Sequence, residues 1–362
     1  MPEANTPENT LAGAVKLDVL IDGKPVDEQE VVAVAVDLDL NQPDMAVCTL
    51  KNAGNRHSYE VKQGQSVEIK LHDDGKVVFK GEVVGIEPVF KAGAESKVVI
   101  RAFNKLHRLL RGRKSRTFQD MSDSDIVGKV AKDHGLNPQC GSDVNIKHKH
   151  VYQHNQTDLE FLRTRAARIG YAVWVEDTKL FFAPPKLKKD SQVVFDMIKN
   201  PNVGHRIKSF APRMSSAAVV KKVTVRGWDP EKKKEIVGEA EAQNSPLGKT
   251  NAAAAITEFG EIKTFTVDHP IASIEEAKAI AKARLDEAML SYITGEAEVF
   301  GNAEYKPGLI VKVVVNDEHK DDKFNGMYLV SGCTHRYIRE GTTTTGGYTT
   351  LLKLARNAEQ GE

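Results

Sequence analysis

The chain has 362 residues, of which 51 are lysine or arginine and 50 are aspartate or glutamate, so its net charge at pH 7 is +1. This balance provides no long-range field toward nucleic acid or anionic lipid, and predicts neither a specific nucleic-acid partner nor a membrane partner. No apolar run approaches the roughly 18 residues that span a bilayer. Three cysteines, Cys48, Cys140 and Cys333, form no CxxC pair, which favours a reducing compartment.

The first third of the chain has the pattern of antiparallel strands. Residues 1–13 are polar and are predicted to form a disordered tail. From residue 14 to residue 110, apolar and polar residues alternate, as in strands with one buried face. We therefore predict a first small β-barrel domain over residues 14–110. Its expected strands are Val15–Ile21, Val31–Leu40, Ala46–Leu50, Gln65–Leu71, Val77–Val89 and Lys97–Phe103.

Residues 111–203 change to a helical pattern and are predicted to form an inserted α+β module. The signals are two capping boxes, each followed by an apolar helical face and a terminating glycine, and then a hairpin. Two helices and a hairpin of this size make one compact unit. These elements are expected at Ser122–Gly135, Thr157–Gly170 and Tyr171–Phe182.

Residues 204–362 are predicted to form a second β-barrel domain that carries an inserted loop and a helix. Strands resume at Val219–Gly227. Glu239–Gly260 is rich in alanine and small polar residues, which predicts a long loop with at most a short helix. Ser273-Ile-Glu-Glu276 caps a helix expected over residues 273–292.

The two β-rich regions carry the same succession of signals, which favours an internal duplication. The offset grows only from 244 residues, Gly64 to Gly308, to 253 residues, Asn104 to Asn357. The alternative is that any two antiparallel sheets share such patterns. Unrelated shapes around the two glycines, or their location on one common sheet, would rule out this pair of look-alike barrels. The predicted fold class is α+β and mainly β, with two similar small β-barrel domains and an inserted α+β module.

His148, His150 and His154 are the best candidates for metal binding. Histidines at i and i+2 face the same side of a regular strand, but no cysteine or carboxylate flanks them at a usual ligand spacing. The preferred interpretation is that no metal binds. No GxSxG, P-loop, HExxH or GxGxxG motif is present. We therefore nominate no catalytic, cofactor-binding or metal-ligating residue and predict no enzyme activity.

The charged motifs have simple structural interpretations. The basic cluster Arg111–Arg116 could contact phosphate, but a solvated linker is preferred because no aromatic side chain interleaves it. The carboxylate pairs Asp123/Asp125, Glu275/Glu276 and Asp321/Asp322 lie at predicted helix starts or loops, where helix-dipole compensation or solvation explains them. Thr342–Gly347 reads as a hairpin tip, either a contact loop or a flexible end.

Several runs resemble a known family. Leu106–Leu110, Arg113–Ile126, Tyr152–Trp174 and the final Tyr348–Leu352 block resemble phage late-control D proteins and the N-terminal half of VgrG spike proteins. These are hub proteins of contractile tails, similar also to the baseplate hub of T-even phages. The motifs are structural rather than catalytic, and the resemblance covers nearly the whole chain.

The resemblance implies a structural baseplate hub of a contractile tail or injection system. Such a hub is a homotrimer in which two barrels per chain make a ring of six, adapting a sixfold tail tube to a threefold spike. The implied partners are a tail-tube (Hcp-like) protein and other baseplate components. VgrG proteins continue into an OB fold and a needle, so a separate OB-fold/needle spike protein is also expected. The implied location is the bacterial cytoplasm during assembly, and then a phage tail or phage-tail-like particle.

Two other functions remain open at this stage. A tail-associated cell-wall hydrolase would release peptidoglycan and lose that activity on substitution of a single carboxylate. A nucleic-acid-binding module using Arg111–Arg116 would bind with an affinity that falls steeply with salt.

Overall fold

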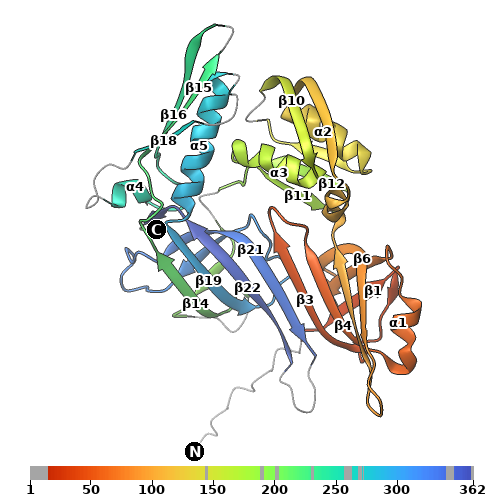
Figure 1. The fold of residues 1–362 in the computed structure, drawn as a ribbon. Helices are drawn as coiled ribbons and strands as arrows, with labels where there is room; N and C mark the ends of the chain where they lie inside the picture. Colours follow the sequence, from red (N-terminus) through yellow and green to blue (C-terminus); the bar gives the residue numbers. More distant parts are fainter. Residues whose placement is uncertain are drawn as a thin grey trace, which may run out of the picture.

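One large, mostly antiparallel sheet of 13 strands dominates the structure. Strands from residues 17–103 form one half of it and strands from residues 194–214 and 293–356 form the other, while two smaller αβ groups stand at one end (Figure 1). The predicted tail and most of the Thr342–Gly347 tip lie outside the described residues. The structure is a computed structural model that describes residues 15–142, 146–187, 191–199, 204–229, 232–256, 263–267, 271, 273–339 and 346–359.

The first half of the sheet contains all six strands predicted for it. Its hydrogen-bonded order is β3-β4-β7-β6-β5-β1, with β2 at the outside. A 3-10 turn η1 (Ala53–Asn55) and the helix α1 (Arg56–Glu60), which were not predicted, connect β4 to β5. The strands are β1 (Leu17–Ile21), β2 (Lys24–Pro25), β3 (Val31–Asp39), β4 (Met45–Lys51), β5 (Ser66–Leu71), β6 (Val77–Val89) and β7 (Lys97–Phe103).

The second half repeats this order as β14-β19-β22-β21-β20-β13. One pairing differs, because β13 runs parallel to β20 whereas β1 runs antiparallel to β5. The strands are β13 (Val194–Asp196), β14 (Ile207–Met214), β19 (Ile293–Phe300), β20 (Ile310–Val314), β21 (Gly326–Ile338) and β22 (Gly347–Arg356). A short pair, β17 (Thr250–Asn251) with β23 (Ala358–Glu359), lies beside them.

The two halves share local geometry as well as strand order. Gly64 and Gly308 both have φ +87°, a left-handed conformation that glycine adopts at the least cost. The amide of Gly64 donates to the carbonyl of Val83 at 2.8 Å, and Gly308 donates to Val330 at 2.8 Å. Directly after each of these valines the ladder to the next strand shifts register. A shared turn and a shared irregularity at the same place support the internal duplication.

The ladders correct the alignment of the two copies in one place. The third strands correspond at an offset of 252, because Ala102 pairs with Val83 as Leu354 pairs with Val330. Asn104 is therefore equivalent to Arg356 and not to Asn357.

The two repeats are not separate sheets. β21 pairs with β3, so both copies belong to one continuous sheet, and no described ladder joins β1 to β3 to close the first half. A common sheet was expected to rule out the pair of look-alike barrels, and the two repeats do share one sheet. The repeated turn and bulge still support duplication, because two similar units can join edge to edge.

The segment after β7 folds around a core of its own. Both predicted capping boxes are present: Ser122 accepts from the Asp125 amide and Thr157 from the Glu160 amide. The pair β8–β10 was not predicted, because its polar residues hide the period of two. The elements are η2 (Lys105–Leu110), β8 (Lys114–Ser122), α2 (Asp123–Asp133), β9 (Asn137–Cys140), β10 (Lys147–Gln156), α3 (Asp158–Arg168), β11 (Ala172–Glu176) and β12 (Lys179–Ala183).

A second αβ group is inserted between β14 and β19, where the first repeat has only the short β3–β4 connection. Its long helix packs across two strands so closely that a side chain at Gly238 would lie 2.2 Å from the Ala277 carbonyl carbon. The described part of the predicted loop holds the end of β16 (Lys234–Glu241), the short strand β17 and one short helix, α4 (Ala252–Ala255), of which only the helix was expected. The other elements are β15 (Lys222–Asp229), β18 (Lys263–Val267) and α5 (Ile274–Leu290).

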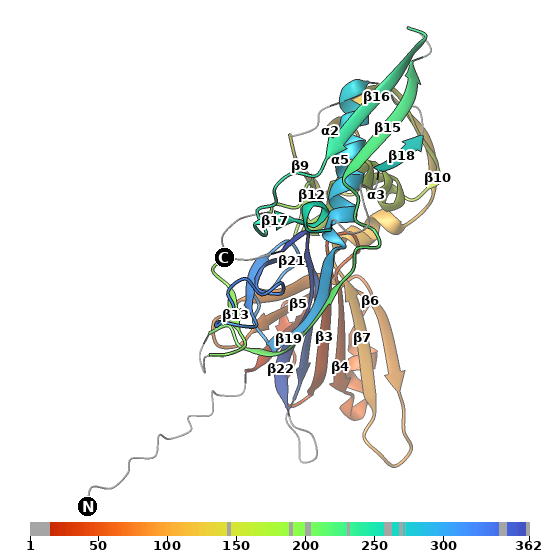
Figure 2. The ribbon, with the colours of Figure 1, turned by 90° about the vertical axis from the view of Figure 1, so that its left-hand side faces the viewer.

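Both αβ groups stand at the same end of the large sheet, and the β6–β7 tip lies at the opposite end (Figure 2). The groups contact each other through α3 and α5, where Arg168 Nη2 donates to Glu276 Oε1 at 2.9 Å. The mainly β, α+β fold class is confirmed. No helix among the described residues combines the length and apolar character needed to cross a membrane.

Candidate assembly interface

The two repeats meet where the second half of β21 pairs with β3. The ladder joins residues 332–338 to residues 33–39 without a register shift. Beyond the end of the ladder, Arg339 N donates to Val32 O at 3.0 Å. On one face, Thr334 Oγ1 donates to Asp37 Oδ1 at 2.6 Å. This internal joint is therefore held by both backbone and side-chain hydrogen bonds.

A buried polar cluster lies on the other face of the joint. His335 is 2% exposed; its Nε2 donates to Tyr305 O at 3.0 Å, and its Nδ1 accepts from the hydroxyls of Tyr348 and Thr350 at 2.8 and 2.9 Å. Burial lowers the pKa of His335 to about 4, so the ring is neutral. The Cys333 sulfur lies 3.7 Å from this ring, and burial raises the pKa of the Cys333 thiol. A neutral thiol beside a weakly basic histidine lacks the activation of a cysteine nucleophile.

A buried carboxyl group ties the first repeat to its inserted module. The Asp44 carboxyl group accepts from Asn104 Nδ2 at 2.8 Å and from the Asp39 amide at 3.3 Å. Burial raises the pKa of Asp44 to about 7. Asn104 Nδ2 also lies 3.4 Å from Val175 O, on β11. The contact therefore couples three segments at the end of the sheet nearest the αβ groups.

Apart from the outer strands β2 and β13, each repeat has a further strand edge without a partner strand among the described residues. β14 pairs only with β19 and ends the sheet. β6 pairs with β5 only as far as Glu82, so residues 85–89 have a neighbour on the β7 side alone. β6 corresponds to β21 and β14 corresponds to β3, so these two open edges are the counterparts of the two strands that form the internal joint.

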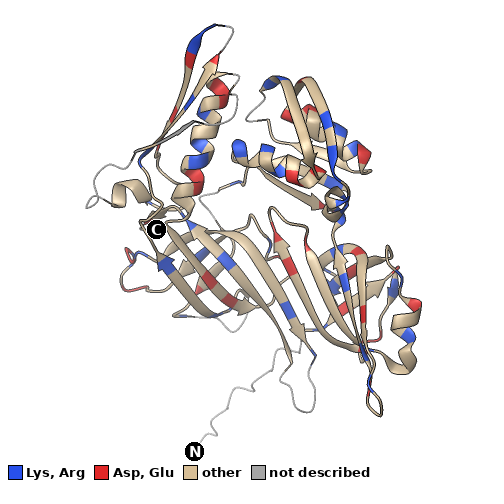
Figure 3. Ribbon diagram, in the orientation of Figure 1, with Lys and Arg blue, Asp and Glu red and all other residues tan. Residues whose placement is uncertain are grey.

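The open edges carry apolar and charged side chains of both signs. Val89 is 50% exposed and Phe90 is 63% exposed at the end of β6. Across the molecule, acidic and basic residues are interspersed rather than gathered in one field (Figure 3). The sequence predicted β6 as a strand but assigned no role to any residue on either edge. Each strand does contain a proline, Pro88 in β6 and Pro212 in β14. Because proline within a sheet is confined to edges and bulges, these two residues could have indicated edge strands.

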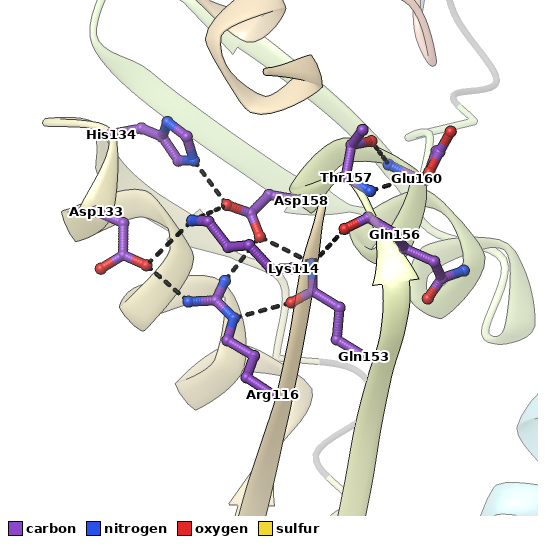
Figure 4. A network of polar contacts seen from close by, with 9 residues as sticks. All are labelled: Lys114, Arg116, Asp133, His134, Gln153, Gln156, Thr157, Asp158 and Glu160. Carbon is purple, nitrogen blue, oxygen red and sulfur yellow. Dashed lines mark hydrogen bonds and ion pairs between the residues drawn. The ribbon is translucent and has the colours of Figure 1, made fainter. Parts of the chain in front are cut away.

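Lys114 and Arg116 of the basic cluster Arg111–Arg116 are engaged inside the inserted module (Figure 4), whereas Arg111 and Arg113 are exposed. The Asp158 carboxylate, with 1% of its side chain exposed, accepts from Lys114 at 2.6 Å, from Arg116 at 2.7 Å and from His134 at 2.8 Å. Burial alone would raise the pKa of Asp158, but hydrogen bonds from these partners and from Gln153 hold it below its usual value. The solvated-linker interpretation is wrong, and a free phosphate-binding cluster is equally disfavoured, because these charges neutralise one another.

The histidine candidates do not come together. His148 is buried against Asp123 and Arg165, with Arg165 Nη2 donating to its Nε2 at 2.7 Å, whereas His150 and His154 are exposed. The opposite strand has a positive φ at Asp120, an irregularity that breaks the alternation of faces. Among the described residues, no three His, Cys, Asp or Glu side chains are placed to hold a metal ion.

The carboxylate pairs also have structural environments. Asp123 and Asp125 lie in the first turn of α2, and Glu275 and Glu276 in the first turn of α5, where negative charge compensates the helix dipole. Asp322 Oδ1 accepts from the Phe324 amide at 2.9 Å. These contacts give no pair of carboxylates arranged for acid and base catalysis.

A groove of about 1580 Å³ lies between α3, α5 and the neighbouring end of the sheet. Its lining mixes both charges, for example Glu160, Arg163, Lys282 and Asp286. The groove is open and no single class of side chain converges in it. It separates the two αβ groups and gives no evidence of a small-molecule site.

Solved structures with this fold are proteins of phage tails and of a secretion machine. A tail protein from Neisseria meningitidis MC58 matches with a TM-score of 0.71 and 15% identity over 96% of this chain and 98% of that one. The 43 kDa tail protein of prophage MuSo2 from Shewanella oneidensis matches with a TM-score of 0.69 and 14% identity, over 95% and 99% of the two chains.

A third similar structure is an Escherichia coli component of the type VI secretion system, described as structurally similar to the T4 tail proteins gp27 and gp5. It matches with a TM-score of 0.63 and 13% identity over 95% of this chain and 78% of that one. None of the curated proteins compared is similar to this chain.

The family comparison extends over almost the whole chain. The family model described as the Alg8 N-terminal domain matches residues 11–340. This range includes the first repeat, both αβ groups, the internal joint between β21 and β3, and the second repeat except its strand β22. The chain therefore belongs to the Alg8 N-terminal domain family.

Proposed function

We propose that this protein is a structural baseplate hub of a contractile tail or injection system. The observation that carries the proposal is the duplicated sheet, which joins its two repeats through one internal joint and leaves the counterpart edges open. The fold shared with phage tail proteins and with a type VI secretion component supports a role in such a particle. The function needs no catalysis.

The symmetry of the sheet supports a homotrimer. A head-to-tail contact between the open β14 edge of one copy and the open β6 edge of the next repeats the internal joint between chains. Three chains then close into a ring of six similar sheet segments. Such a ring has threefold symmetry by chain and near-sixfold symmetry by repeat, so it can adapt a sixfold tail tube to a threefold spike.

In this proposal each part of the chain has a place in the ring. Residues 14–110 and 204–362 provide the two ring units, and residues 111–203 form the inserted module beside them. The partners are a sixfold tail-tube protein, a threefold spike protein and other baseplate components. The ring assembles in the bacterial cytoplasm and becomes part of a phage tail or phage-tail-like particle.

Co-expression with the tube and spike proteins encoded beside it, followed by electron microscopy, tests the proposal. We expect a closed ring of three chains, with a tube on one face and a spike on the other. A chain absent from the assembled particles, or present with another symmetry, would refute it. A peptidoglycan-release assay on the purified chain tests the hydrolase alternative, and we expect no turnover.

A further inference from the structure

The internal joint defines a register for the two open edges. In the first repeat Ala102 pairs with Ala46, which pairs with Val36; the equivalent path in the second repeat is Leu354, Gly295 and Pro212. Each residue of β14 is therefore equivalent to the residue of β3 whose number is 176 lower (212 minus 36). Each residue of β21 is equivalent to the residue of β6 whose number is 247 lower (330 minus 83). Applying both offsets to the internal pairs aligns β6 of one chain with β14 of another, residue by residue.

The side chains that meet in this register are complementary. On one face Glu87, which already accepts from Arg101 Nε of its own chain at 2.6 Å, lies opposite Arg213 of the second copy, where the internal joint has the hydrogen bond from Thr334 to Asp37. On the other face Ile86 and Phe90 lie opposite Met214 and Phe210 of the second copy. Opposite charges and apolar side chains directly across a strand pair stabilise it. The register came only from backbone pairing, so this agreement is independent support.

One pair in the register cannot form hydrogen bonds. Ser215 N donates to Tyr292 O at 2.8 Å, so alternation along β14 points the nitrogen of Pro212 to the open side. Asn104 N donates to Asp44 O at 2.9 Å, so the odd-numbered residues of β7 bond to β6. The nitrogen of Pro88 therefore also points outward. Proline has no amide hydrogen, and these two prolines face each other where the internal joint has His335 and Val36.

We propose that β6 and β14 of neighbouring copies pair in this register, and that the facing prolines make each seam between chains weaker than the joint within a chain. The inference rests on the proposed ring. It adds which strand edges meet between neighbouring chains, and it adds that the two prolines limit the strength of this contact. The seam between chains is held by side chains and by the hydrogen bonds on either side of the proline pair. The free chain is thereby kept from open-ended edge pairing, and the ring closes reversibly.

Disulfide trapping tests the register. Val89 and Ala211 of neighbouring copies form a non-hydrogen-bonded pair, whose Cα separation of about 4.5 Å suits a disulfide. The variant Val89→Cys/Ala211→Cys, with the exposed Cys140 replaced by serine, should give covalent dimers and trimers on mild oxidation of concentrated protein. Val89→Cys/Ser215→Cys, four residues out of register, is the matched control and should give neither. Equal trapping in both variants, or in neither, overturns the register.

Proline replacement tests the control of the seam. Pro88→Val/Pro212→Val restores two amide donors at each seam, and should tighten self-association in sedimentation velocity by about tenfold or more. Unchanged or weaker association overturns the role of the prolines. Arg213→Glu should weaken association, and Glu87→Arg combined with Arg101→Glu, which keeps the ion pair within the chain while reversing the charge at residue 87, should restore it. Arg226→Glu is the matched control, because it changes an exposed arginine that pairs with Glu235 far from the edge, and should have no effect.

These outcomes separate the inference from the proposed function. A threefold ring in particles without trapping at residues 89 and 211 leaves the hub standing and removes the seam. Trapped trimers that bind neither tube nor spike leave the seam standing and remove the hub.

Discussion

The two repeats of the sheet differ in what they attach to the same framework. Both contain the same three-stranded succession, with a glycine turn before it and a bulge within it. The first repeat closes β3 to β4 within a few residues, whereas the second inserts an αβ group at that point. The first repeat instead continues from β7 into its own module. The difference shows that the strand framework is fixed by pairing geometry, while the connections at one end are free to grow.

Asn104, directly after β7, and its counterpart Arg356, at the end of β22, both anchor neighbouring segments to the sheet, but with different hydrogen-bonding groups. Asn104 bonds to Asp44 and to the Val175 carbonyl. Its counterpart Arg356 is fully buried; its Nη1 donates to Asn325 O at 2.6 Å and its Nε donates to Leu247 O at 3.2 Å. A guanidinium group supplies more donors in a fixed plane than an amide does. We therefore expect the second anchor to be the stronger one.

Replacing Arg356 should have the largest effect on this comparison. Arg356→Met keeps much of the volume but leaves buried carbonyl groups of the anchored loops without donors, which should cost about 4 kcal/mol of unfolding free energy. The measurement is chemical denaturation followed by circular dichroism. Arg336→Met on the adjacent strand, whose side chain is exposed, is the control and should cost less than about 0.5 kcal/mol. Equal effects of the two changes would contradict the anchor.

Acid should destabilise the second repeat through His335, which is replaced by Pro88 at the equivalent site of the first. The folded-state pKa of about 4 lies below the ordinary value of 6.5, so the unfolded chain binds the proton first as pH falls. This contribution to stability is complete above pH 6.5 and is lost between pH 6.5 and pH 4, by up to about 3 kcal/mol. Thermal unfolding of the protein and of His335→Gln across this range checks it. Because Asp44, whose folded-state pKa is about 7, contributes a slope of the opposite sign in this window, the readout is the difference in stability between the protein and the variant. This difference should shift by up to about 3 kcal/mol between pH 6.5 and pH 4, and a constant difference would refute the role of His335.

Asn104→Ala should have an intermediate effect. The change removes the donor to Asp44 and the cap that accepts from the Leu106 amide. Loss of a buried hydrogen bond and a cap should cost about 2 kcal/mol. Hydrogen exchange should show the loss mainly in η2 and β11, because Asn104 joins these to the sheet. Uniform destabilisation of both repeats would show that the anchor is not local.

The strand framework was predictable because its signals are local. Alternation over Val77–Val89 and Lys97–Phe103 gave both strands with the bounds that the structure has, and the capping boxes at Ser122 and Thr157 located two helices. The pair β8–β10 was missed because buried Asp158 satisfies its basic residues, so a strand with a polar interior reads as a linker. When charged side chains are buried because they pair with one another, the buried positions of a strand are not apolar. The alternation of apolar and polar residues that predicts a strand is then absent.

The candidate interface was not predictable from alternation alone. An edge strand and a central strand can have the same pattern of buried side chains, since burial depends on the faces of the sheet and not on its edges. The sequence also concealed the continuity of the sheet, because β3 and β21 are almost 300 residues apart and no local signal joins them. Only the ladders placed Pro88 and Pro212 at equivalent outward positions.

The smallest expected effect is the most direct test of the repeat itself. Gly64→Ala and Gly308→Ala each place a side chain on a residue with φ +87°, and the space around both is open or nearly so, with Leu40 Cδ2 at 4.0 Å from the added atom at Gly308. The cost is then conformational and should be about 1 kcal/mol in each case. If the turns are true copies, denaturation midpoints should shift by the same amount within error. A large difference would mean that the matching φ values conceal different surroundings, since only a steric or tertiary contribution could separate two residues with the same backbone strain.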